Sequence, residues 1–146
     1  MGEKVKGNLI IIGGAEDKVG SKTILKHVVD TVDGQEKSLV VLTTATEQPI
    51  EAGNNYRMVF ESLGLNNIQI LNINTRDEAN DEKNVEIIRN CSGVFFTGGD
   101  QLRITSILGG TATNLALQQV YSQGVLIVGT SAGASVMSNT MIVEGD

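Results

Sequence analysis

The chain has little of several residue types on which other classes of protein depend. It contains one cysteine, one proline and one histidine among 146 residues. The single cysteine, Cys91, excludes a disulfide within the chain and most metal sites built from thiolates. The scarcity of proline suits regular helices and central strands. Apolar runs such as residues 9–12 are far too short to cross a bilayer, and no cleavable apolar segment follows the N-terminus. We therefore expect a cytoplasmic protein with no membrane partner.

Basic residues are also scarce. Lysine and arginine number 11 against 17 aspartates and glutamates, which gives a net charge of -6. No basic cluster could neutralise a run of phosphates, so we expect no nucleic-acid partner. Apolar residues make up 40% of the chain and charged residues 19%, which predicts a folded domain rather than a disordered segment. The sequence contains no repeat and no linker, so we expect residues 1–146 to belong to a single α/β domain.

Short apolar runs alternate with segments of helical spacing along the chain. The runs are typical of strands buried on both faces, and the helical segments carry apolar residues on one face. The expected strands are residues 9–12, 38–43, 67–73, 93–97 and 125–128, and the expected helices are residues 21–32, 50–63, 81–89, 101–108 and 113–121. Repeated strand–helix units imply right-handed crossovers and a mostly parallel sheet with helices on both faces. The sequence therefore predicts a three-layer α/β/α fold, in which ligands bind at the carboxyl ends of the strands.

The expected helix over residues 50–63 illustrates the pattern. Its spacing places Tyr56, Val59, Phe60 and Leu63 on the buried face. Gly64 follows as the expected stop of the helix, because glycine readily adopts the left-handed conformation that ends many helices.

A five-residue motif follows the last expected strand. Gly129-Thr130-Ser131-Ala132-Gly133 matches the G-x-S-x-G pattern of a nucleophile elbow. In such an elbow the serine occupies a sharp strand-to-helix turn, and the glycines allow the strand and the helix to pack closely. The helix behind Ser131 directs its positive end at the site, and the amide of Ala132 is available to bind a developing oxyanion. We interpret Ser131 as a nucleophile rather than as part of a turn of small residues.

A second glycine-rich turn ends the preceding expected strand. Gly98-Gly99-Asp100 would lie beside the elbow, where a second oxyanion donor is needed, and we favour the amide of Gly99 for that role. The alternative is a tight strand-to-helix turn in which Asp100 caps the next helix. Gln101 and Arg103 then open that helix, either near the cleft or on its exposed surface.

One other segment and two single residues suggest chemistry but fail on spacing or position. Residues 14–23 resemble a phosphate-binding loop, yet they have one residue too many between the glycines, and a serine precedes the lysine. The only histidine, His27, falls in the middle of a crossover helix away from the strand ends. Cys91 precedes a strand, where packing is its expected role. We assign neither residue to catalysis and expect no cofactor and no metal.

Three motifs together resemble the cyanophycinase family of serine peptidases, which also contains aspartyl dipeptidases. They are Gly13-Gly-Ala-Glu-Asp-Lys18, Phe96-Thr-Gly-Gly-Asp-Gln101 and Gly129-Thr-Ser-Ala-Gly-Ala134, in the family's order and spacing. The resemblance implies a flavodoxin-like sheet similar to that of class I glutamine amidotransferases, with serine in place of their cysteine. It implies hydrolysis of cyanophycin, an aspartate backbone with arginine on its side chains, to β-aspartyl-arginine dipeptides.

The same resemblance assigns roles to individual residues. It makes Ser131 the nucleophile, gives the oxyanion hole to Gly99 and Ala132, and gives substrate contacts to Gln101 and Asp100. It also makes a homodimer conceivable, although no exposed apolar stripe demands one. The peptide substrate is the one partner that the resemblance implies.

One departure from the family pattern concerns the base of the catalytic triad. The family takes its histidine and its acidic partner from beyond the elbow, and nothing up to Asp146 matches them. A serine hydroxyl is a poor nucleophile without a positioned base. We therefore expect the N-terminal part of a longer peptidase domain, incomplete at its C-terminus, and no turnover by these residues alone. Three alternatives stay open: a non-catalytic binding or regulatory homologue, an aspartyl dipeptidase, and an ester hydrolase that shares only the elbow.

Overall fold

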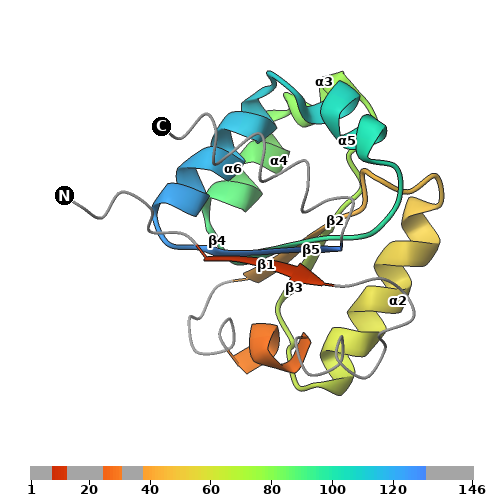
Figure 1. Cartoon of the computed structure of the whole chain (residues 1–146), viewed down its shortest axis with the longest axis vertical. Coiled ribbons are helices and arrows are strands. Elements are labelled where there is room, and N and C mark those ends of the chain that lie inside the picture. The colour runs from red at the N-terminus through yellow and green to blue at the C-terminus, as the bar shows by residue number, and fades with distance from the viewer. Residues whose placement is uncertain (1–7, 13–24, 31–37, 131–146) are drawn as a thin grey trace.

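A parallel sheet forms the centre of the computed structural model, which describes residues 8–12, 25–30 and 38–130 (Figure 1). In this part of the chain the sheet has five strands: β1 (Asn8–Ile12), β2 (Ser38–Leu42), β3 (Ile68–Leu71), β4 (Cys91–Phe96) and β5 (Leu126–Thr130). Their order is β1-β5-β4-β2-β3, and every neighbouring pair is parallel. The predicted parallel sheet is confirmed.

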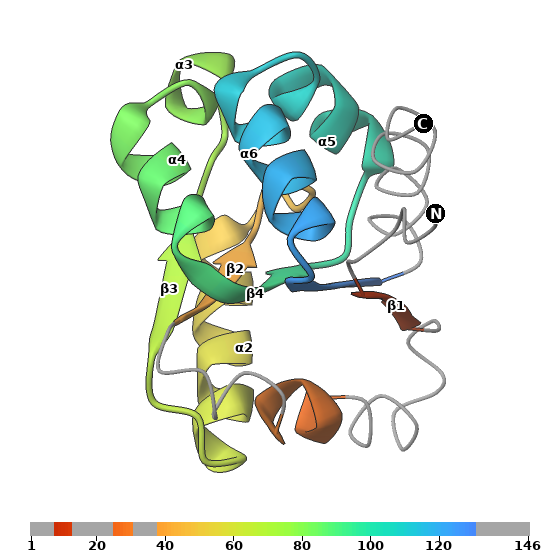
Figure 2. The same ribbon diagram turned by 90° about the vertical axis from the view of Figure 1, so that its left-hand side faces the viewer.

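Helices cover both faces of the sheet. The described part of the chain contains α2 (Pro49–Ser62), α3 (Arg76–Ala79), α4 (Glu82–Arg89), α5 (Gln101–Leu108) and α6 (Ala112–Ser122), and residues 25–30 are also helical. Helices α3 to α6 lie on one face, and α2 lies with residues 25–30 on the other (Figures 1 and 2). The described residues therefore form the three α/β/α layers that the sequence predicts.

The core is divided by the sheet into two clusters. Successive side chains of a strand point to opposite faces. Accordingly Val40 and Leu42 of β2 pack into the cluster under α4 and α6, while Leu39 and Val41 pack with Phe60 of α2. All five side chains are completely buried. The apolar runs of the sequence are thus continuous because both of their faces need partners.

Several elements differ in detail from the sequence prediction. The third strand is shorter than expected, β4 begins two residues earlier, and α3 was not expected at all. Gly64 has a φ of 101°, as expected for a glycine that ends a helix. Val59 was expected on the buried face of α2, but it is 36% exposed. The buried residues of α2 are Gly53 and Phe60, which are two turns apart, so the helix buries a narrow stripe that excludes Val59.

The order of the strands creates a switch point between β2 and β4. From β2 the chain passes through α2 to β3 on one side, and it then returns to place β4 on the other side. The segments that leave β2 and β4 therefore turn to opposite faces, toward α2 and α5 respectively (Figures 1 and 2). In open α/β sheets, the crevice outside such a pair of strands is the usual place for a ligand.

Candidate active site

Two segments meet at the switch point: residues 43–48, which lead from β2 to α2, and residues 97–100, which lead from β4 to α5. The Thr97 amide donates a hydrogen bond to the Leu42 carbonyl at 3.0 Å, which continues the pairing of the two strands. The Asp100 amide donates to the Ala45 carbonyl at 2.9 Å. The two segments are therefore bonded to each other beyond the ends of their strands.

Gly99 requires the absence of a side chain for two separate reasons. Its φ of 148° lies in the region that L-residues rarely adopt. A Cβ atom at this position would lie 2.5 Å from the carbonyl carbon of Ala45, closer still to its oxygen, and 3.0 Å from the Thr46 amide nitrogen. Gly99 is exposed, and no described residue accepts a hydrogen bond from its amide. The geometry is that of a close backbone crossing with an N–H group left for another acceptor.

Asp100 caps α5. Its Oδ1 accepts a hydrogen bond from the Leu102 amide at 2.9 Å, which satisfies one of the free donors at the start of the helix. The capping role that the sequence left as the alternative is therefore present. It is compatible with a role for the neighbouring Gly99 amide, because the cap uses the side chain of Asp100 and not the turn before it. Gln101 is the first residue of α5.

Arg103 joins α5 to the segment after β2. Its Nε donates to the Thr44 carbonyl at 3.0 Å, and the side chain is half-buried. The sequence left open whether this residue faces the cleft or the exposed helix surface. In the structure its side chain reaches the switch point. No feature of the sequence announced the bond to Thr44, which lies 59 positions earlier in the chain.

Polar side chains form a row directly beyond the core of the sheet. Leu42 is paired with both Leu71 and Phe96, so Thr43 follows in line with Asn72 and Thr97. The Thr43 hydroxyl lies 2.6 Å from Oδ1 of Asn72. The hydroxyls of Thr44 and Thr97 are buried and have no partner among the described residues. Thr43 and Thr97 are the last residues of two strands expected from the sequence, which predicts no role for either of them.

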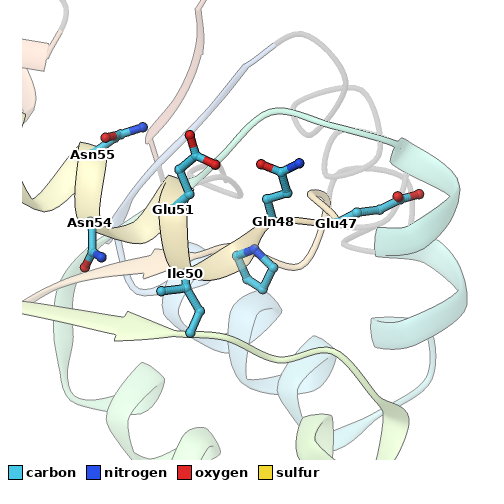
Figure 3. Close-up of a pocket in the computed structure, with 7 residues that line it drawn as sticks. Glu47, Gln48, Ile50, Glu51, Asn54 and Asn55 are labelled. Carbon is cyan, nitrogen blue, oxygen red and sulfur yellow. The ribbon is translucent and has the colours of Figure 1, made fainter.

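An open pocket of about 640 Å³ lies at the start of α2. It is lined by Glu47, Gln48, Pro49, Ile50, Glu51, Asn54 and Asn55. Figure 3 shows that Gln48, Glu51 and Asn55 project to one side of the helix, that Ile50 and Asn54 project to the other, and that Glu47 extends away from the start of the helix. None of the described lysines or arginines pairs with either carboxylate. The pocket therefore carries negative charge beside the carboxyl ends of the strands.

The strand expected before the G-x-S-x-G motif is present. β5 lies between β1 and β4, with Gly129 paired to Phe96 and Thr130 paired to Ile12. Ser131 and Ala132 come next in the chain and lie outside the described residues. Since β4 and β5 are parallel neighbours, their carboxyl ends, Phe96 and Thr130, lie at the same edge of the sheet.

The structure describes His27 and Cys91, the two residues that the sequence does not assign to catalysis. His27 is exposed on the helical segment 25–30, and Cys91 is buried in the core cluster under α4 and α6. No group of metal-ligating side chains occurs among residues 8–12, 25–30 and 38–130. None of the described helices has both the length and the apolar character to cross a membrane.

Fold and site together define the class of the protein. It is a flavodoxin-like α/β protein with a parallel sheet, and the candidate residues that the structure describes, Gly99, Asp100 and Gln101, follow the carboxyl end of β4. The model of peptidase family S51 matches residues 9–146. The chain belongs to this family.

Similar proteins agree with the assignment. The chain is 33% identical to the cyanophycinase of Geminocystis herdmanii over 146 residues, which cover 99% of the chain and 54% of that protein. It is 35% identical to the cyanophycinase of a Nostoc species over 144 residues, which cover 98% of the chain and 48% of that protein. The chain thus spans about half the length of the curated relatives it matches.

Solved structures show the same fold. A peptidase from an acI-B1 actinobacterium superposes with a TM-score of 0.78 at 23% identity, over 93% of this chain and 58% of that one. A putative peptidase E from Listeria monocytogenes superposes with a TM-score of 0.63 at 22% identity, over 92% of this chain and 66% of that one.

Proposed function

We propose that the protein is a serine-type exopeptidase that hydrolyses cyanophycin to β-aspartyl-arginine dipeptides. The observation that carries this proposal is the match to cyanophycinases over nearly the whole chain, at 33% and 35% identity. The G-x-S-x-G motif at residues 129–133 supports it, because its first two residues are the last two of β5, a central strand of the sheet.

In the proposed mechanism Ser131 is the nucleophile. Its hydroxyl oxygen attacks the carbonyl carbon of the scissile peptide bond, and its proton passes to a general base. The amides of Gly99 and Ala132 donate hydrogen bonds to the oxyanion that forms. The amide nitrogen of the leaving group then takes the proton, the peptide bond breaks, and water releases the acyl group from the serine. The base and its acidic partner come from outside residues 1–146, so we propose that these residues alone show no turnover.

Substrate contacts are assigned to residues around the switch point. Gln101 and Asp100 open α5 beside Gly99, and we propose that both contact the substrate. The pocket at the start of α2 supports an arginine-bearing substrate over an acidic one. Glu47 and Glu51 place two carboxylates there without a described cationic partner, which favours guanidinium groups and disfavours further carboxylates.

The experiment that tests the proposal is covalent labelling of the protein translated from the complete gene. A fluorophosphonate probe should modify Ser131, as mapped by mass spectrometry, and purified cyanophycin should yield β-aspartyl-arginine dipeptides. Ser131→Ala should abolish both, with a loss of turnover of roughly 10⁶-fold. Ser122→Ala is a matched control, because Ser122 is an exposed serine of α6 whose hydroxyl donates to the Gln118 carbonyl.

The possible outcomes separate the proposal from its alternatives. Labelling of Ser131 with hydrolysis of short aspartyl peptides but not of cyanophycin would indicate an aspartyl dipeptidase. Hydrolysis of acyl esters alone would indicate an esterase. An unlabelled, folded protein would indicate a binding or regulatory homologue.

A further inference from the structure

The turn that carries Gly99 and the segment that follows β2 are joined by a closed ring of hydrogen bonds. The Asp100 amide donates to the Ala45 carbonyl at 2.9 Å. One residue earlier in the same segment, the Thr44 carbonyl accepts from Nε of Arg103 at 3.0 Å. The Arg103 amide in turn donates to the Asp100 carbonyl at 3.1 Å. Two adjacent carbonyls are therefore both bonded to the segment that begins at Gly99.

We propose that Arg103 is a positioning residue for the Gly99 amide, an inference that rests on the proposed role of Gly99 as an oxyanion donor. Gly99 packs so closely on Ala45 that no side chain fits between them. The atoms on which Gly99 rests belong to the peptide between Ala45 and Thr46, and the peptide between Thr44 and Ala45 directly precedes it. A displacement of the peptide between Thr44 and Ala45 is therefore passed on through the Cα atom of Ala45. Arg103 holds that peptide by the Thr44 carbonyl. It thereby fixes the direction of the Gly99 N–H group without contacting the substrate.

The chemistry of arginine suits this role. The guanidinium group is planar and presents its donors in fixed directions, so a bond from Nε also sets the orientation of the acceptor. A bond from a charged donor in a half-buried position is also stronger than one between neutral groups. Lysine could place a charged donor near the same carbonyl, but its ammonium group rotates freely on a flexible stem. Arginine at this position combines a strong bond with a defined direction.

The chain offers a matched control in Arg76. Its Nη1 donates to the carbonyl of Ser106, a residue of α5, at 3.0 Å. Like the bond from Arg103 to Thr44, it joins a guanidinium group to a backbone carbonyl. Ser106 lies in the C-terminal half of α5, whereas Asp100 caps the N-terminal end beside Gly99. The two arginines thus make similar bonds, and only one of them reaches the segment on which Gly99 rests.

The test compares Arg103→Met, Arg103→Lys and Arg76→Met in the protein translated from the complete gene. We expect Arg103→Met to lower kcat by about 10- to 100-fold with KM changed by less than about 3-fold. The reason is that a misdirected oxyanion donor stabilises the transition state less well and leaves the binding of the substrate unchanged. A substrate-like peptide aldehyde, which forms an oxyanion with the serine, should bind more weakly by the same factor as kcat/KM falls. Arg103→Lys should recover part of kcat. Arg76→Met should leave kcat and aldehyde binding unchanged.

Each outcome bears on the proposal. A rise in KM with kcat unchanged in Arg103→Met would mean direct substrate contact and would overturn it. An equal loss of kcat in Arg76→Met would show that the loss in Arg103→Met reflects general destabilisation, and this result would also overturn the proposal. If Arg103→Met does not fold, Arg103→Lys carries the comparison, and an unchanged kcat and aldehyde affinity there would overturn the inference. Failure of the fluorophosphonate to label Ser131 in the unsubstituted protein would overturn both this inference and the proposed function. If Ser131 is labelled but Arg103→Met keeps a normal kcat, only this inference is overturned.

Discussion

Gly99 lies directly against the carbonyl group of Ala45, where the segments after β4 and β2 cross at the carboxyl edge of the sheet. The next residue, Asp100, donates its amide hydrogen to the same carbonyl. The crossing occurs because β2 and β4 are neighbours in the sheet while the helices that follow them cover opposite faces. The fold thus presents a glycine amide at the point where flavodoxin-like proteins bind their ligands.

Gly99→Ala should inactivate the protein. The new Cβ would meet the Ala45 carbonyl, and a φ of 148° is costly for alanine, so the turn would have to move. Moving or losing one oxyanion donor typically costs about 10²- to 10³-fold in kcat. We therefore expect a loss of that size in the hydrolysis of cyanophycin, measured as initial rates of dipeptide release.

Gly64→Ala is the control for backbone strain. Gly64 also has a positive φ, of 101°, but a Cβ there would meet nothing within 4 Å. We expect about 1–3 kcal/mol of lost stability in urea unfolding and full activity. Similar losses of kcat in both glycine variants would show that strain, and not the contact with Ala45, explains the first result.

The strands and their order along the chain were predictable because burial on both faces leaves an uninterrupted apolar signal. Residues 38–43, for example, were expected as a strand, and β2 spans Ser38–Leu42. The short helix α3 was not predicted, since four residues are too few to show a helical period. In the structure Thr75 caps this helix by accepting a hydrogen bond from the Glu78 amide, and threonine is a residue type favoured at that position.

The site was predictable only where a motif is local. Gly98-Gly99-Asp100 could be recognised as a tight turn that ends a strand and caps a helix, because its residues are consecutive. The bond from Arg103 to Thr44 depends on the strand order, which brings residues 59 positions apart into contact. No periodicity or composition encodes that pairing, so a sequence alone could place Arg103 near the cleft but could not name its partner.

Asp100→Asn should separate the capping role of Asp100 from its charge. Asparagine caps helices as well as aspartate does, so the free energy of unfolding should stay within about 0.5 kcal/mol of the original, whereas Asp100→Ala should lose about 1 kcal/mol. If the carboxylate contacts an arginine-bearing substrate, Asp100→Asn should raise KM by up to about 5-fold, as expected for an exposed ion pair.

Asp81 supplies the comparison for this pair of variants. Its Oδ1 accepts from the Lys83 amide at 3.0 Å at the start of α4, in the same way as Asp100 does in α5. Asp81→Asn should change neither stability nor KM, and Asp81→Ala should reduce stability alone. An unchanged KM in Asp100→Asn would show that Asp100 caps α5 and that its charge does not contribute to substrate binding.

Glu51→Gln should weaken the binding of cationic substrates in particular. Glu51 lines the pocket at the start of α2 together with Glu47, and its side chain projects to the same side of the helix as Gln48 and Asn55 (Figure 3). Removing one negative charge should raise KM for arginine-bearing substrates by a few-fold and leave KM for neutral aspartyl peptides unchanged. Glu61→Gln is the control, since Glu61 is exposed near the opposite end of the same helix. Equal effects on both substrates, or equal effects of both variants, would exclude a specific role for this pocket.

Tyr56 should make the folded state sensitive to alkaline pH. Burial raises the pKa of the Tyr56 phenol above its ordinary value of 10.0, and the ring packs against Phe95 with 4.7 Å between centroids. Below the ordinary pKa both the folded and the unfolded chain keep the proton, so stability is unaffected. Above it the unfolded chain loses the proton first, and the free energy of unfolding falls until the pH passes the pKa of the folded state.

Tyr56→Phe keeps the ring and removes the ionisable group. Urea unfolding between about pH 9 and about pH 11 should therefore show a fall, limited to about 1.4 kcal/mol per pH unit, that is smaller in Tyr56→Phe. Parallel curves for the two proteins would show that the phenol does not ionise on unfolding in this range.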